Sequence, residues 1–288
     1  MTERTAFVLG GGGVLGAVEV GMLRALLELG VRPDLILGTS VGALNGALVA
    51  ADPDHGVVDR LVDLWRSAAA GREVYGDGAV RQVTRAVRTG THLHSAKPLR
   101  QRLQAELGER TFADLAVEFQ CCAASIERAA EHWFTQGRVV DAVVASAAVP
   151  GLLRPAVVDG EHYLDGGIVN SIPIGRAVEC GATRIYVLQV GRIDRPLQPP
   201  RRPWEVARVS FEIARRHRFH HDMAHLPPGV QAHVLPSGAH SSDAGSGKDD
   251  RLLAYRDFTA VQRRIDDAYE MSRRYLLENG HRSAAGPA

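Results

Sequence analysis

The first fifty residues alternate short apolar runs with glycine-containing turns. Residues 6–9 form an apolar run that ends at four consecutive glycines, and leucines then recur at helical spacing as far as Gly30. A second apolar run at 35–37 passes directly into a Gly-Thr-Ser-Val-Gly turn, which an Ala- and Leu-rich stretch follows. This alternation of strand, helix, strand and helix predicts a largely parallel sheet with helices on both faces.

The later part of the chain continues the alternation. Residues 57–107 have a helical pattern interrupted by glycines, strands are predicted at 118–125, 131–135 and 184–190, and a helix is predicted at 139–148. We therefore expect an α/β fold of three layers, α/β/α, with a mainly parallel central sheet that binds ligands at the carboxyl ends of its strands. The 57–107 segment is expected to cap that site and to select the substrate.

No composition break delimits a second hydrophobic core, so the chain is interpreted as one domain. Its predicted parts are a core at 5–191, a C-terminal extension of the same domain at 192–281, and a frayed tail at 282–288. Composition divides the extension into an exposed linker at 192–203, a helical segment, a mobile loop at 236–250 and a C-terminal helix.

Charge and cysteine content narrow the partners. The chain has 34 basic and 33 acidic residues, so no overall field favours nucleic acid. Its three cysteines lack metal-ligand spacing, and we predict neither a metal nor another cofactor. The N-terminal residues do not fit a signal peptide and no apolar stretch is long enough to span a bilayer, so we expect a cytoplasmic protein.

The segment Gly38-Thr39-Ser40-Val41-Gly42 has the G-x-S-x-G pattern of a nucleophile elbow. Such a turn lifts the serine hydroxyl above the sheet, and its two glycines relieve the crowding around it. The alternative is an ordinary turn between a strand and a helix. Because the segment lies between an apolar strand and an apolar helix, the elbow is favoured and Ser40 is the predicted nucleophile.

The glycine-rich turn after the first strand presents free backbone N–H groups at the positive end of a helix dipole, which favours an anion. Gly11, Gly13 and Gly16 also satisfy a dinucleotide-binding pattern, but the second strand lacks the acidic residue that would hold the ribose. A phosphate-binding loop would need a lysine after the glycines, and none follows. We therefore predict an oxyanion hole facing Ser40.

A serine nucleophile needs a base, and Asp165 is the candidate. It follows a short apolar segment and precedes Gly166 and Gly167, so the chain can turn sharply and present the carboxylate at a strand end. Taken alone, Asp-Gly-Gly is better explained as a structural turn, because Asp-Gly turns are common.

Together these three motifs, in this order, resemble the patatin-like phospholipase family over nearly all of residues 5–191. Four further landmarks are similar to those of the family: Leu64-Trp65, Pro98-Leu99-Arg100, Thr111-Phe112-Ala113-Asp114-Leu115 and Ala145-Ser146-Ala147-Ala148-Val149-Pro150-Gly151. The resemblance implies a serine acyl hydrolase of lipid esters with a catalytic dyad, in which Asp165 takes the proton of Ser40. The residues that it assigns to the oxyanion hole are Gly11, Gly12 and Gly13. Those that support the motifs are Gly16, Gly38, Gly42, Gly166 and Gly167.

Two positions depart from the family pattern. Leu15 stands where the family usually has Arg or Lys, and Asn170-Ser171 stands where it usually has Asn-Asn. Since backbone N–H groups hold the oxyanion, Leu15 should leave the hole intact, but it removes a basic side chain that would hold a phosphate head group. The substrate therefore stays open among phospholipids, lysophospholipids, neutral glycerides and acyl thioesters.

Two other functions remain open. One is an α/β-hydrolase type esterase or thioesterase, in which His233 or His240 would complete a triad with Ser40 and Asp165. Against it, that fold usually reaches its elbow only after several strands. The other is a non-catalytic lipid-binding module, against which the presence of both Ser40 and Asp165 argues.

The segment 204–226 combines a helical apolar pattern with many arginines and histidines. A basic amphipathic helix can lie on an anionic membrane surface, and a helix packed on the core with a solvated basic face has the same pattern. Peripheral membrane contact is thus one of two interpretations. Nothing in the sequence specifies an oligomeric state.

Overall fold

The computed structural model describes residues 3–70, 92–190, 193, 196–201, 203–238 and 258–280. The strands are β1 (Thr5–Leu9), β2 (Leu35–Thr39), β3 (His92–His94), β4 (Glu118–Ser125), β5 (Ala130–Phe134), β6 (Gly151–Leu153), β7 (Ala156–Val158), β8 (Glu161–Asp165), β9 (Arg184–Leu188) and β10 (Gln231–Val234). The α-helices are α1 (Ala17–Glu28), α2 (Val41–Ala51), α3 (Gly56–Ala70), α5 (Lys97–Leu107), α6 (Val139–Ser146), α7 (Ile174–Glu179), α8 (Pro203–Ala224) and α10 (Phe258–Glu278). Three short 3-10 turns are η1 (Gly13–Gly16), η2 (Phe112–Asp114) and η3 (Gly166–Ile168).

The central sheet contains eight of the described strands in the order β10-β9-β1-β2-β4-β8-β7, with β5 also paired to β4. The five strands from β10 to β4 are parallel, whereas β5, β8 and β7 pair in the antiparallel direction. The predicted parallel sheet is therefore present, but the sheet as a whole is mixed. The strand predicted at 131–135 is present as β5. β7 and β8 were not predicted, because both are short and carry no strong alternation of apolar and polar residues.

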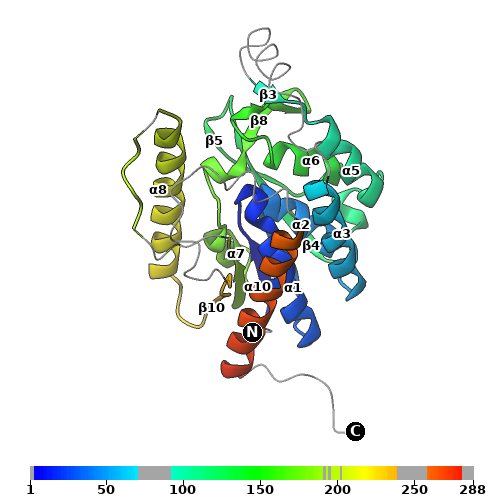
Figure 1. Cartoon of the computed structure of the whole chain (residues 1–288), viewed down its shortest axis with the longest axis vertical. Helices are drawn as coiled ribbons and strands as arrows, with labels where there is room; N and C mark the ends of the chain where they lie inside the picture. Colours follow the sequence, from blue (N-terminus) through cyan, green and yellow to red (C-terminus); the bar gives the residue numbers. More distant parts are fainter. Residues whose placement is uncertain are drawn as a thin grey trace.

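Helices cover both faces of this sheet, as the sequence predicted (Figure 1). Alternate strand residues enter two separate apolar clusters: Phe7, Leu9 and Ile36 pack with α1, α2, α3, α6 and α10, whereas Val8 and Leu37 pack with α7 and with Phe219 of α8. Because successive side chains of a strand point to opposite faces, the two clusters identify the two faces. The three-layer α/β/α arrangement is confirmed.

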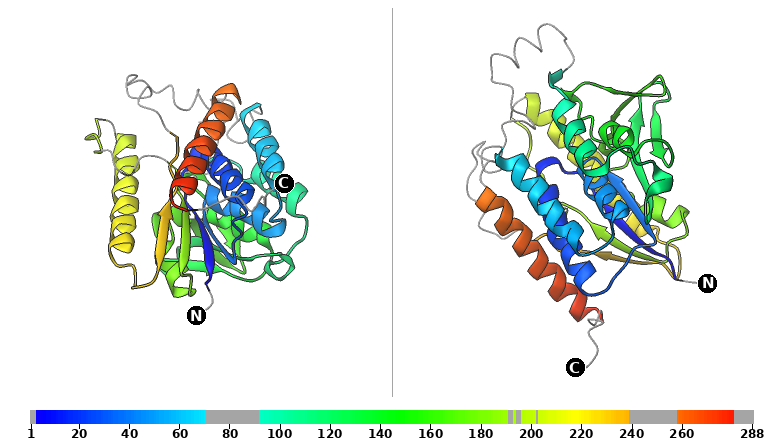
Figure 2. Two further views of the ribbon diagram at one scale, coloured as in Figure 1. Left: turned by 90° about the horizontal axis from the view of Figure 1, so that it is seen from below. Right: turned by 90° about the vertical axis from the view of Figure 1, so that its right-hand side faces the viewer.

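The residues after 191 add to the same core. β10 extends the parallel sheet next to β9, and α10 lies along α1 (Figure 2). The helix predicted at 204–226 is confirmed as α8, which begins at Pro203 within the segment expected to be a linker. The predicted loop at 236–250 lies mostly outside the described residues, as do 71–91 of the segment predicted to cap the site. The division into a core, an extension and a tail stays a prediction.

The contact between α1 and α10 depends on a residue without a side chain. A Cβ at Gly21 would lie 2.1 Å from the Ile265 carbonyl oxygen and 2.8 Å from the Tyr269 backbone nitrogen, so the two helix backbones approach closely there. This close approach allows α10 to cover α1.

We expect Gly21→Ala to lower the free energy of unfolding by about 1–3 kcal/mol, the usual cost of overpacking, because α10 must shift to admit the methyl group. Gly56→Ala is the matched control, since the nearest atom to its new Cβ is the flexible Asp54 carboxylate at 3.3 Å. Denaturant unfolding of both variants checks the prediction. Equal stability of the two would show that the α1–α10 contact does not require glycine.

Candidate active site

Two strands end against each other at one point of the sheet. β2 runs parallel to β4 up to Thr39, which lies opposite Cys122, and β8 runs antiparallel to β4 up to Asp165, opposite Ala123. β5 pairs with residues 121–125 of β4, a stretch that overlaps the residues paired with β2 and those paired with β8. Because β5 fills one edge of β4 there, β2 and β8 must both lie on the opposite edge, where they run toward each other. Their carboxyl ends therefore meet, and Ser40 comes to lie beside Asp165.

Ser40 occupies the strained turn that a nucleophile elbow requires. Its φ is 56° and its ψ is −120°, and residues other than glycine seldom adopt a positive φ. The turn is tight enough that a Cβ at Gly38 would lie 2.5 Å from the Ala43 Cα and one at Gly42 would lie 2.3 Å from the Leu9 carbonyl oxygen. The predicted strand-to-helix turn is confirmed, with both glycines at positions that admit no side chain.

The Ser40 side chain is joined directly to Asp165. Ser40 Oγ donates a hydrogen bond of 2.6 Å to Asp165 Oδ2, and the Gly167 N–H donates one of 2.8 Å to Asp165 Oδ1. The two side chains are almost fully buried. Burial raises the pKa of the Asp165 carboxyl to about 6, although the hydrogen bonds from Ser40 and Gly167 act in the opposite direction. A carboxylate with this pKa is ionised near neutral pH and still basic enough to accept a proton.

Ser146 holds the backbone of Ser40 in place. Its hydroxyl accepts a hydrogen bond of 2.9 Å from the Ser40 N–H and donates one of 2.6 Å to the Cys122 carbonyl. It thereby links the end of α6, the elbow and β4. The sequence placed Ser146 in a landmark that resembles the family but gave it no role, because nothing in the local pattern shows which distant backbone groups it meets.

The glycine loop lies next to Ser40, but not all of its N–H groups are free. The Gly11 N–H donates a hydrogen bond of 2.9 Å to the Ser171 carbonyl, so it is not available to an oxyanion. The N–H groups of Gly12 and Gly13 have no hydrogen-bond acceptor among the described residues. Of the three amides that the resemblance assigned to the oxyanion hole, the structure leaves these two unoccupied.

The other motif glycines are sites of close packing. A Cβ at Gly16 would lie 2.3 Å from Val41 Cγ2, one at Gly166 would lie 2.1 Å from the Cys122 carbonyl oxygen, and one at Gly167 would lie 2.6 Å from Phe211 Cζ. At each of these positions the lack of a side chain allows a neighbouring residue to pack directly on the glycine. The glycines thus set how closely the glycine loop approaches the elbow, and how closely the Asp165 turn approaches β4 and α8.

A buried polar bridge joins the helices that follow the glycine loop and the elbow. Asn45 of α2 donates hydrogen bonds to Glu19 Oε2 of α1 at 2.8 Å and to the Gly16 carbonyl at 3.0 Å, and Trp65 Nε1 donates to Asn45 Oδ1 at 3.2 Å. Full burial raises the pKa of Glu19 well above its usual value, so the neutral form is favoured. Sequence analysis missed this bridge, because Glu19 and Asn45 match no motif.

Helix α8 packs against the site from the face of the sheet opposite to α1 and α2. Phe211 packs on Gly167, and the guanidinium of Arg215 donates two hydrogen bonds, of 3.2 and 3.1 Å, to the Val190 carbonyl. Val190 in turn packs on Gly12, where a Cβ would lie 1.8 Å from its Cγ2. Arg215 is buried, and in the sequence it was one of several arginines with no sign of this role.

The histidines of the alternative triad do not reach Ser40. His233 lies in β10 opposite Tyr186 of β9, on which its ring stacks with the centroids 5.2 Å apart. β10 is three strands from β2, roughly 14 Å at the usual strand spacing, so His233 cannot hydrogen-bond to Ser40. His240 lies outside the described residues.

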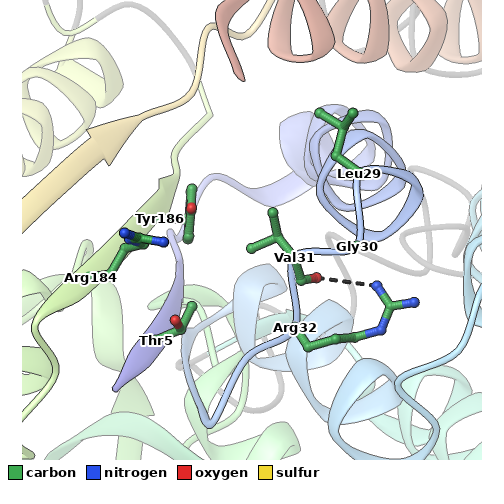
Figure 3. A pocket seen from close by; sticks show the side chains of 7 residues that line it. All are labelled: Thr5, Leu29, Gly30, Val31, Arg32, Arg184 and Tyr186. Carbon is green, nitrogen blue, oxygen red and sulfur yellow. Dashed lines mark hydrogen bonds between the residues drawn. The ribbon is translucent and has the colours of Figure 1, made fainter. Parts of the chain in front are cut away.

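A polar pocket of about 260 Å³ is found at the other end of the sheet (Figure 3). It is lined by residues that include Thr5 and Arg184, which begin β1 and β9, and Arg32, which follows α1. Ser40 follows the carboxyl end of β2, which is parallel to β1, so the pocket is separate from the Ser40–Asp165 pair.

Among the described helices, none has the length and apolar composition needed to cross a membrane.

The chain belongs to the patatin-like phospholipase family, whose model matches residues 7–178. It is 31% identical over 195 residues to Lysophospholipase nte1 of Aspergillus terreus and 32% identical over 193 residues to the patatin-like phospholipase domain-containing protein ZK370.4 of Caenorhabditis elegans. Each alignment covers 65% of this chain but only 12% and 14% of those proteins. VipD from Legionella pneumophila aligns with 96% of the chain and 67% of its own, at 14% identity and a TM-score of 0.46. The family resemblance in the motifs is confirmed.

We expect kcat/KM for a neutral ester to rise with pH through about 6 and then to level off. Asp165, the base that the sequence predicts, can accept a proton only when it is ionised. Because burial raises its pKa to about 6, we expect activity to be lost as the pH falls through that value. His233→Ala should show the same loss of activity at acid pH, since β10, which carries His233, is three strands from β2. Initial rates across the acid and neutral range check this. If kcat/KM of His233→Ala no longer fell at acid pH, the group responsible would be the histidine and not Asp165.

Proposed function

We propose that the protein is a serine acyl hydrolase of lipid esters in which Ser40 is the nucleophile and Asp165 is its base. The observation that carries the proposal is the hydrogen bond of 2.6 Å from Ser40 Oγ to Asp165 Oδ2. Ser40 Oγ attacks the ester carbonyl carbon while its proton passes to Asp165. The N–H groups of Gly12 and Gly13 stabilise the negative charge that develops on the carbonyl oxygen.

The same two residues complete the cycle. The protonated Asp165 gives its proton to the departing alcohol, which leaves an acyl group on Ser40 and the carboxylate restored. A water molecule then loses a proton to Asp165 as it attacks the acyl carbonyl, and the fatty acid leaves when Ser40 takes that proton back. No histidine is needed, because one carboxylate of raised pKa accepts and returns the proton in both halves.

For the substrate we propose an acyl glycerophospholipid, with a lysophospholipid favoured. The support is the family match and the names of the fungal relatives, which are lysophospholipases. Leu15 contributes no charge to a phosphate head group, so head-group binding must rest on other residues. Neutral glycerides and acyl thioesters are the alternatives that a substrate panel would separate.

We also propose peripheral contact with membranes through α8, which stands on the outside of the molecule (Figure 1). Val206 and Ile213 are seven residues apart, so they lie on one face of the helix, and they are 50% and 55% exposed. The exposed histidines His217 and His220 continue this face. An exposed apolar stripe along an outer helix suits contact with a lipid surface.

The central test is hydrolysis of a short-chain p-nitrophenyl ester by wild type, Ser40→Ala and Asp165→Asn, with fluorophosphonate labelling of the same samples. Wild type should turn over and label. Each variant should lose at least about 10²-fold in kcat, since one lacks the nucleophile and the other the base. His233→Ala should retain activity. A folded wild type that neither turns over nor labels would favour the lipid-binding module instead.

Flotation with vesicles tests the membrane contact. The Val206→Ser/Ile213→Ser double variant should lower the fraction bound to anionic vesicles by about tenfold or more, because two aliphatic side chains no longer enter the lipid. Val157→Ser is the matched control, being 52% exposed on β7. Hydrolysis of a water-soluble ester should be unchanged in both. Equal binding of the double variant and the control would refute the role of α8.

A further inference from the structure

Ser171 carries a buried hydroxyl that the proposed mechanism does not use. The residue follows the Asp165 turn and is 3% exposed. Its Oγ has no hydrogen-bond partner among the described residues. A buried hydroxyl left unpaired costs about 1–3 kcal/mol, so an arrangement of this kind calls for an explanation.

The position of this hydroxyl is fixed by the glycine loop. The Ser171 carbonyl accepts the hydrogen bond from the Gly11 N–H, which holds the two segments together at 2.9 Å. The space where a Gly11 Cβ would stand is bordered by Ser171 Oγ at 3.2 Å and by Ser40 Cβ at 3.4 Å. The free hydroxyl and the nucleophilic side chain therefore face the same small space.

We propose that the Ser171 hydroxyl is a third donor of the oxyanion hole, a role that rests on the proposed function. When Ser40 Oγ bonds to the carbonyl carbon, the carbonyl oxygen becomes negative and accepts a hydrogen bond from Ser171 Oγ as well as from the Gly12 and Gly13 amides. Ser171 keeps its proton throughout. It takes the place of the Gly11 amide, whose hydrogen bond to the Ser171 carbonyl removes it from the set.

The arrangement also explains why the unpaired hydroxyl is tolerated. Donors that are already in place when charge develops need no reorganisation, and a donor left without a partner in the free enzyme gains one only as the reaction proceeds. The interaction is therefore stronger in the transition state than with the neutral ester, so its loss should lower kcat rather than raise KM.

The test compares side chains with and without the hydroxyl in two shapes. Ser171→Ala removes the hydroxyl from the native residue. Ser171→Thr and Ser171→Val have side chains of nearly equal size, and only the threonine carries a hydroxyl. Ser272→Ala is the matched control, a buried serine on α10 whose hydroxyl donates to the Pro236 carbonyl. Each variant is assayed on the p-nitrophenyl ester and with a trifluoromethyl ketone, which forms an oxyanion with Ser40.

We expect kcat to fall about 10²-fold in Ser171→Ala and to be lower in Ser171→Val than in Ser171→Thr by a similar factor, with KM within about twofold. Affinity for the ketone should fall in parallel, while the melting temperature of Ser171→Ala should be no lower than that of wild type, because the lost hydroxyl has no partner in the free enzyme. An active wild type whose kcat and ketone affinity are unchanged in Ser171→Ala and equal in the Thr and Val variants overturns this inference alone. An inactive, unlabelled wild type overturns the proposed function and this inference together.

Discussion

The site depends on the meeting of two strands along one edge of β4. β2 delivers Ser40 and β8 delivers Asp165 from opposite directions, and the register of each strand on β4 fixes where it ends. A shift of either strand by one residue would send the side chain to the other face of the sheet. The hydrogen bond of 2.6 Å between the two residues is thus set by backbone pairing, and the surrounding elements act to keep that pairing in place.

Several features of the site oppose stability and are held by packing. Ser40 has a positive φ, and Asp165 and Glu19 are carboxyls removed from water. Against these costs, the motif glycines let backbone and side chains of neighbouring elements approach directly, and Ser146 and Asn45 pair polar groups that would otherwise be buried alone. Substitution of a motif glycine would therefore disturb the geometry of the site as well as its stability.

Part of this support lies beyond the residues that the family model matches. α8 contacts the Asp165 turn through Phe211 and the segment beside the glycine loop through Arg215. Both halves of the proposed machinery, the base and the oxyanion donors, thus rest on one helix. The outer face of α8 is also the proposed lipid contact. The same helix would therefore bind the lipid surface and hold the geometry of the site.

The sequence by itself determined the class of fold, the elbow with Ser40, the glycine loop and the candidate base. These are local patterns, since the order of apolar runs, glycines and one acidic residue is enough to define a strand, a tight turn and a helix. Only the tertiary structure decided which of these groups meet. It placed Asp165 on an antiparallel strand, gave the Gly11 amide to Ser171, left His233 three strands away and brought Ser146, Asn45 and Arg215 to their supporting positions. The reason is physical: hydrogen bonds between residues distant along the chain depend on strand register and helix packing, and no local pattern specifies either.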